Sequence, residues 1–164
     1  SQVRQDFNCF GGFGQQGYGY NVSNLTGEIK RIMGIDRKHT IIIVGAGNIG
    51  HALTNFPGFA ETGFEVKALF DVNEDLIGTE IKGHPVLDVK DMDEYIRENQ
   101  IDIGVIAARR SAAQEIANRM CAAGIRGIWN FVPLDITTSV PIENVHLSES
   151  LSTLSYKIEH GLLD

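Results

Sequence analysis

A glycine-rich turn between a predicted strand and a predicted helix constrains the fold of this chain most strongly. The apolar run Ile41–Val44 predicts a buried strand, and it is followed by the six residues Gly45, Ala46, Gly47, Asn48, Ile49 and Gly50. In a G-x-G-x-x-G turn the first glycine permits the tight turn, the second lets the backbone approach a pyrophosphate, and the third allows close packing of helix on strand. The N–H groups at the start of the following helix favour phosphate groups at the same place. The turn therefore predicts a dinucleotide-binding site.

An aspartate stands where such a site needs a carboxylate. Asp71 ends a second predicted strand, Glu65–Asp71, about 20 residues after Gly50, the spacing at which an acidic side chain accepts hydrogen bonds from the adenosine ribose. Its charge would repel a 2′-phosphate, which favours NAD over NADP. The alternative is a glycine-rich turn beside a solvated aspartate that binds no nucleotide.

Short apolar strands alternate with helical segments from Thr40 onward. Because parallel strands are joined by crossover helices, this alternation predicts an α/β protein with a doubly wound, mostly parallel sheet of the Rossmann type. The expected elements, in chain order, are strands at Ile41–Val44, Glu65–Asp71 and Pro85–Leu87, a helix at Val89–Asn99, a strand at Ile101–Ala108, a helix at Ala112–Gly124 and a final strand at Gly127–Phe131.

Both ends of the chain differ in composition from this central region. Phe10–Asn21 contains five glycines and four aromatic residues, which predicts a turn-rich ribbon. Apolar residues then recur at helical spacing from Val22 to Met33. Near the C-terminus, Val145–His160 predicts an amphipathic helix that packs either on its own domain or on a second subunit. Its apolar stripe comprises Leu147, Leu151, Leu154 and Ile158.

Charge and cysteine content exclude several classes of protein. The 164 residues include 14 basic and 21 acidic ones, for a formal charge of −7, so the chain alone is not expected to bind a nucleic-acid backbone strongly. Its apolar runs are shorter than the roughly 18 residues of a membrane span, and no signal sequence opens it. A cytoplasmic location without membrane contact is therefore expected. Cys9 and Cys121 stand far apart without a CxxC motif, which argues against disulfides and bound metal.

No grouping typical of catalysis accompanies the glycine-rich turn. A dehydrogenase needs an acid or base beside the nicotinamide and a substrate domain. The five histidines of this chain show no triad-like or ligand-like arrangement, so we expect no catalytic residues and no enzymatic activity. Two alternatives stay open. One is a CoA- or NAD-binding Rossmann domain of an enzyme, of the acyl-CoA ligase or oxidoreductase type; the other is a dimerisation module with a vestigial nucleotide site.

Several ordered sequence blocks resemble one known family. They are QVRQDF, FGGFGQQGYGYNV, VGAGNIGHAL, FDVNEDLIG, AAQEIANRMCAAGIRGIWNF and ENVHLSESLSTLSY. Together they resemble the Rex family of redox-sensing transcriptional repressors over almost the whole chain. The resemblance implies a homodimer in which an N-terminal winged-helix domain binds operator DNA and a Rossmann domain senses the ratio of NADH to NAD⁺. It also implies a C-terminal helix swapped onto the other subunit, and release of the operator when NADH binds.

The resemblance divides the chain into four parts. Residues 1–20 correspond to the remnant of a winged-helix domain ending in its wing, 21–38 to a helix and linker, 39–144 to the Rossmann domain and 145–164 to the swapped helix. Because most of the winged helix is absent, operator binding by this chain is expected to be weak or nil. The family usually carries a basic residue in the wing, where this chain has glutamines. The implied remnant DNA contacts are Arg4, Gln15, Gln16 and Tyr18.

The nicotinamide end must distinguish the two redox forms, because NADH and NAD⁺ share their adenosine and pyrophosphate groups. The neutral dihydronicotinamide tolerates an apolar pocket, whereas the charged ring loses hydration there. The candidate residues are Ala107, Ala108, Arg109, Asn130, Phe131 and Pro133, with Leu151, Leu154 and Tyr156 from the terminal helix of a second subunit.

Two departures from the family concern this end of the site. The resemblance implies a switch ion pair between Arg110 and an aspartate of the other subunit's terminal helix, but His146 occupies the aspartate position here. Ala108 and Arg109 replace a Val-Pro pair that the family usually has after its fourth strand. An arginine that faces a histidine would be repelled when the histidine is protonated.

Overall fold

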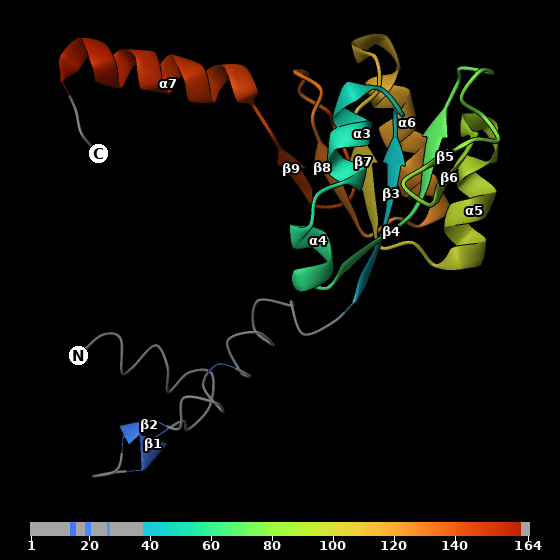
Figure 1. The fold of residues 1–164 in the computed structure, drawn as a ribbon, viewed down its shortest axis with the longest axis horizontal. Helices are drawn as coiled ribbons and strands as arrows, with labels where there is room; N and C mark the ends of the chain where they lie inside the picture. Colours follow the sequence, from blue (N-terminus) through green and yellow to red (C-terminus); the bar gives the residue numbers. More distant parts are fainter. Residues whose placement is uncertain (1–13, 16–18, 21–25, 27–37, 162–164) are drawn as a thin grey trace. The chain divides into compact units, whose positions relative to one another are not determined.

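The computed structural model describes residues 14, 15, 19, 20, 26 and 38–161, which belong to two compact units, Ser1–Lys38 and His39–Asp164 (Figure 1). In the first unit, β1 (Gly14–Gln15) pairs antiparallel with β2 (Gly19–Tyr20), so the described part of the glycine-aromatic segment is a ribbon. Thr26 is helical. Other predictions for this unit lie outside the described residues; they concern Arg4, Cys9, Gln16, Tyr18 and the rest of the helix expected at 22–33.

The second unit is built on a seven-stranded sheet with the order β5-β6-β4-β3-β7-β8-β9. All neighbouring strands are parallel except β5 and β6. The chain runs outward from β3 to β6 and then returns to β7 on the other side of β3, which is the Rossmann order and confirms the predicted fold class. The strands are β3 (His39–Val44), β4 (Phe64–Asp71), β5 (Glu80–Ile81), β6 (His84–Asp88), β7 (Ile103–Ile106), β8 (Gly127–Asn130) and β9 (Ile142–Asn144).

Apolar clusters lie on both faces of this sheet. Ile42 and Val44 of β3 join a cluster with the longer helices α5 and α6, while Ile41 and Ile43 join a second cluster with Phe59 of the short helix α4. Because Ile41–Val44 of β3 are buried on both faces, this run is continuously apolar rather than alternating. The helices are α3 (Asn48–Thr54), α4 (Gly58–Glu61), the 3₁₀ turn η1 (Val89–Asp91), α5 (Met92–Asn99), α6 (Arg110–Ala123) and α7 (Leu147–His160) (Figure 1).

Some element boundaries differ from the predictions. The expectation that Gly127–Phe131 is the final strand is wrong, because β9 follows it and pairs parallel with β8. This strand is three residues long and contains Glu143 directly after Pro141 and Ile142, so it shows no apolar run. The helix expected at Val89–Asn99 opens with the 3₁₀ turn, because Asp88 accepts a hydrogen bond from Lys90 N–H at 2.9 Å. No helix in the described ranges is long and apolar enough to cross a membrane.

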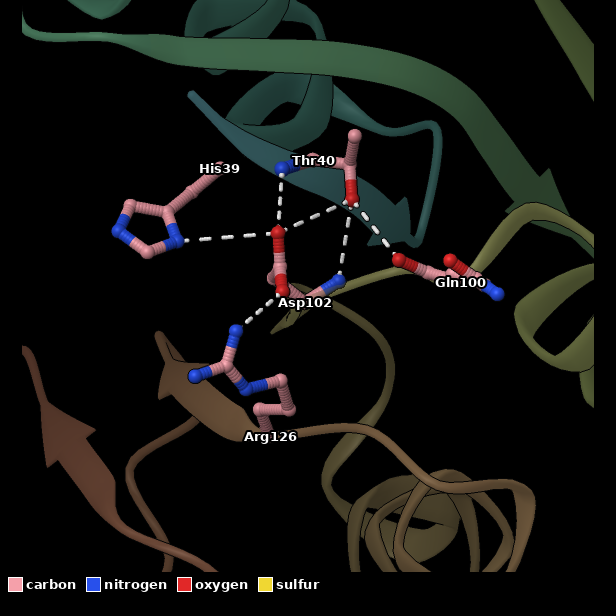
Figure 2. A network of polar contacts seen from close by, with 5 residues as sticks. All are labelled: His39, Thr40, Gln100, Asp102 and Arg126. Carbon is pink, nitrogen blue, oxygen red and sulfur yellow. Dashed lines mark hydrogen bonds and ion pairs between the residues drawn. The ribbon is translucent and has the colours of Figure 1, made fainter. Parts of the chain in front are cut away.

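A polar network ties together the amino ends of three parallel strands (Figure 2). Asp102, just before β7, accepts hydrogen bonds from Thr40 N–H at 3.1 Å and from Arg126 Nη1 at 2.8 Å, and His39 Nδ1 lies 3.7 Å from it. Burial alone would raise the pKa of Asp102, but the Thr40 hydrogen bond and the Arg126 charge together lower it below the ordinary aspartate value. The network therefore links β3, β7 and β8 at this end of the sheet.

Candidate functional site

The turn between β3 and α3 accepts only glycine at its first position. Gly45 has a φ of +107°, and a Cβ there would lie 2.4 Å from the carbonyl oxygen of Ala107. Its N–H donates to Phe70 O at 2.8 Å. The turn is therefore wedged between the carboxyl ends of β4 and β7, and a side chain would force these strands apart.

The other two glycines of the turn differ in what surrounds them. A Cβ on Gly50 would lie 2.0 Å from Gly45 O, so this glycine lets α3 pack closely on the turn. A Cβ on Gly47 would meet nothing within 4 Å. Gly47 is the N-cap of α3, and in the described part of the chain no side chain caps this helix and no acidic residue occupies its first turn. The second glycine thus exposes backbone where a pyrophosphate would approach.

The carboxylate of Asp71 is held against this turn by backbone donors. Its Oδ2 accepts from Ala46 N–H at 2.7 Å, and its Oδ1 accepts from Val72 N–H at 2.8 Å and Asn73 N–H at 2.9 Å. Since each carboxylate oxygen has two lone pairs, Oδ2 keeps the capacity to accept one more hydrogen bond. The residue predicted for ribose binding is thus oriented in advance and still has a free lone pair.

The predicted sites at the end of β7 lie beside the same turn. Ala107 donates its N–H to Val44 O at 2.8 Å, and both Ala107 and Ala108 are half-buried. Arg109 is the N-cap of α6, and Arg109 and Arg110 are exposed. The crevice between β3 and β7 is the point where the strand order reverses, which is where α/β proteins of this type bind ligands.

The predicted sites after β8 divide into one buried and two accessible residues. Asn130 is fully buried, and its amide Nδ2 lies within hydrogen-bonding distance of Val132 O, Leu134 O and Asn144 Oδ1. Its side chain therefore holds the loop after β8 and is not open to a ligand. Phe131 is half-buried, with its ring centroid 4.6 Å from that of Trp129, and Pro133 is exposed.

The residues predicted to act between subunits are exposed along α7. The exposed fractions are 69% for Leu151, 53% for Leu154 and 58% for Tyr156. His146 is the N-cap of this helix, and its Nδ1 lies 3.8 Å from Glu149 Oε1. Within residues 38–161, Arg110 forms no ion pair. Within the same residues, no hydrogen bond joins Arg110 to His146.

An apolar hollow on the sheet was missed by the sequence analysis. It has a volume of about 600 Å³ and lies over Ile41 of β3 and the first residues of β4, β7, β8 and β9, beside α4. Aromatic rings form much of its wall, with Phe59 packed edge to face on Trp129 at 6.0 Å. Ile103 and Ile142 also line it. The aromatic residues between 56 and 64 were the available signal, but their partners come from strands far along the chain.

In the described residues, no three side chains of His, Cys, Asp or Glu come together as a metal site would need. Cys121 is a free, half-buried thiol on α6. These observations give the chain a nucleotide-type crevice and no grouping of metal ligands within that part.

Comparisons with known proteins agree with this geometry. A family model described as a CoA binding domain matches residues 36–134. A redox-sensing transcriptional repressor Rex from Clostridioides difficile (strain 630) is 52% identical over 98% of this chain and 78% of that protein. The Rex of Clostridium perfringens (strain SM101 / Type A) is 47% identical over 98% of this chain and 77% of its own length.

A solved structure gives the same result. The crystal structure of RSP in complex with beta-NAD⁺ and operator DNA matches with a TM-score of 0.90 and 47% identity, over 99% of this chain and 76% of that one. RSP is described as a Rex-family repressor. The relatives are named as transcriptional repressors and not as enzymes, in agreement with the expectation from the sequence. By its sequence and its fold, this chain belongs to the Rex family of redox-sensing transcriptional repressors.

Proposed function

We propose that residues 39–144 bind NADH and NAD⁺ in the crevice between β3 and β7. The observation that carries this proposal is Asp71, whose Oδ2 is fixed by Ala46 N–H at 2.7 Å yet retains an acceptor site for a ribose hydroxyl. Gly47 opens the adjacent backbone to the pyrophosphate. RSP, which matches this chain closely, has been crystallised with beta-NAD⁺ and with beta-NADH, which supports the choice of ligand.

Discrimination between the two redox forms is assigned to the nicotinamide end. The adenosine and pyrophosphate contacts are common to both forms, so they add affinity without selectivity. Arg109 and Arg110, exposed at the start of α6, place positive charge near the end of β7. Such charge disfavours the cationic ring of NAD⁺ more than neutral dihydronicotinamide. Phe131 and Pro133 would provide an apolar wall, which also favours the neutral ring.

We propose a homodimer in which α7 of one copy covers the apolar hollow of the other. Few large apolar side chains in the described region are more than half exposed, and four of them lie on α7. They are Leu147, Leu151, Leu154 and Ile158. The hollow offers aromatic surface of the kind that buries leucine side chains. A helix with such a stripe gains stability only when another surface covers it.

The regulatory output would be the release of operator DNA when NADH binds. A ligand can shift a dimer between two arrangements only by its difference in affinity for them. The segment 1–20 would belong to the DNA-binding domain, with Gln15 on the β1–β2 ribbon as its wing, and Arg4, Gln16 and Tyr18 as further contacts. Segment 21–38 would link it to the sensor. Such a regulator would act in the cytoplasm, without a membrane.

The test is a calorimetric titration of the chain with NADH, NAD⁺, ATP and CoA. We expect NADH to bind more tightly than NAD⁺, and both to bind more tightly than ATP or CoA. Equal affinity for NADH and NAD⁺ would contradict the redox-sensing role. Binding of CoA alone would instead favour a CoA-binding domain, which the match to the CoA binding family model makes the specific competing function.

A further inference from the structure

A buried asparagine joins the predicted nicotinamide end of the site to the start of α7. Among the described residues, Asn130 is the one buried polar residue, and none of its surface is exposed. It ends β8 and stands in parallel register beside Asn144, the last residue of β9. Two residues after Asn144 the chain reaches His146, the N-cap of α7. Asn130 therefore lies where β8, which ends at the predicted nicotinamide site, pairs with β9, which leads into α7.

The hydrogen bonds of Asn130 reach both sides of this junction. On the loop after β8, its Nδ2 lies 3.0 Å from Val132 O and 3.2 Å from Leu134 O, and its Oδ1 accepts from Val132 N–H at 2.9 Å. On the other side, Nδ2 lies 2.8 Å from Asn144 Oδ1, and the backbone carbonyl accepts from Val145 N–H at 2.8 Å.

These contacts exceed what the amide can satisfy at once. The Nδ2 group carries two hydrogens, but three acceptors lie within hydrogen-bonding distance of it. A small movement of the loop carbonyls would change which acceptors share the two hydrogens, and in a buried site each unmade bond has a high cost. Two hydrogens and three acceptors allow two kinds of pairing of the amide, one that includes Asn144 and one with the two loop carbonyls only.

We propose that the Asn130–Asn144 pair couples occupancy of the nicotinamide end to the position of α7. The inference rests on the proposed binding of NADH near Phe131 and Pro133. A ligand against this loop moves the carbonyls of Val132 or Leu134, and the Asn130 amide transmits this shift to β9. Asn130 and Asn144 are positioning residues in this account, because neither touches the ligand.

The test measures hydrogen exchange of the full chain, with and without NADH, in peptides covering residues 144–152. In the wild type we expect NADH to change exchange there by about tenfold, in the range typical of coupling between two sites. Asn144→Leu has the same branched side-chain skeleton but no acceptor for Asn130, so the NADH-dependent change should fall below about twofold. Asn144→Asp keeps an acceptor oxygen and should retain the wild-type change.

A matched control comes from Gln114, a side chain outside β8 and β9 that binds the segment between these two strands. Gln114 of α6 donates to Thr137 O at 2.8 Å and accepts from Thr137 N–H at 3.0 Å, so it also anchors the β8–β9 connection but not β9 or α7. Gln114→Ala should leave the NADH-dependent change as in the wild type. Equal loss in Gln114→Ala and Asn144→Leu would overturn the proposal, because general loosening would then explain both.

Affinity for NADH is measured by calorimetry on each variant, so that two failures can be told apart. If the wild type does not bind NADH, the proposed function fails. If it binds NADH but exchange in residues 144–152 stays unchanged, or if Asn144→Leu keeps the full change, the function stands and the coupling inference is wrong. If Asn144→Leu does not fold, the inference is judged by Asn144→Ser, whose shorter hydroxyl should weaken the coupling, and an undiminished change in that variant refutes it.

Discussion

Asp71 and Asp102 are carboxylates at opposite ends of the same sheet, and they have opposite surroundings. Both accept a backbone N–H next to or within β3, from Ala46 and Thr40 respectively. Asp102 also binds Arg126 Nη1 at 2.8 Å and lies near His39. Asp71 has backbone donors only, and one oxygen keeps a free lone pair. The comparison teaches that a strand-end aspartate is structural when its charge is paired with a cation of the protein, as Asp102 is with Arg126, whereas an aspartate held by backbone donors alone keeps its charge available for a ligand.

The largest expected effect distinguishes two glycines at the carboxyl end of the sheet: Gly50, which allows close packing of α3, and Gly47, which exposes backbone to a ligand. Gly50→Ala places a Cβ 2.0 Å from Gly45 O, so it should lower the free energy of unfolding by about 3 kcal/mol. Gly47→Ala meets no atom within 4 Å and should leave stability unchanged while weakening NADH binding. Urea unfolding and calorimetry of the two variants measure the difference. Equal destabilisation by both would show that the turn has no separate binding position.

The next effect concerns Asp102, the carboxylate that is paired with a cation. Asp102→Ala removes the partner of Thr40 N–H and Arg126, and should cost about 2 kcal/mol of stability at neutral pH. NADH affinity should stay within about twofold of the wild type, because Asp102 lies at the far end of the sheet. Urea unfolding and calorimetric titration test the two statements. A large loss of affinity would mean that the two ends of the sheet are not independent.

The pH dependence of this variant gives an internal check. The pKa of Asp102 is lowered in the folded protein, so the folded state binds this proton more weakly than the unfolded state. The stabilisation is therefore complete above the ordinary aspartate pKa of 3.8 and is lost as the pH falls through the lower, folded value. The stability difference between wild type and Asp102→Ala should be constant from neutral pH to about pH 5 and should shrink in more acidic solution.

The smallest expected effect concerns Asp71, the carboxylate held by backbone donors alone. Asp71→Asn replaces Oδ1 or Oδ2 by an NH₂ group and removes the charge, so it should lower NADH affinity by about tenfold, or about 1.4 kcal/mol. It should also reduce the disadvantage of a ligand that carries a 2′-phosphate. Titration with NADH and NADPH measures both changes. If NADH affinity is unaltered, Asp71 has only the structural role that Asp102 has.

The sequence predicts the carboxyl end of the sheet better than the amino end. The glycine turn and Asp71 could be identified because the roles of their residues follow from local conformation and spacing. Asp102 and Thr40 are separated by 62 residues, and nothing in either neighbourhood signals that they pair. The same reason explains the missed hollow, whose walls come from five strands.

The role of Asn130 could be predicted only in part. Its place at the end of an apolar strand indicated a position near a ligand, and the structure does put it beside the loop that carries Phe131. Its burial depends on β9, which the hydrophobic pattern did not reveal. Because the acceptor on Asn144 comes from this strand, the internal use of the amide was not visible in the sequence.

The lateral margins of the sheet limit how copies of this chain can join. One edge strand is β5, with two residues, and the other is β9, with three. Edge strands this short present few unpaired backbone N–H and C=O groups to a neighbouring molecule, so a continuous sheet across two molecules would gain few hydrogen bonds. Self-association is thereby directed away from strand addition, the route that leads to open-ended fibres, and toward contacts between side chains.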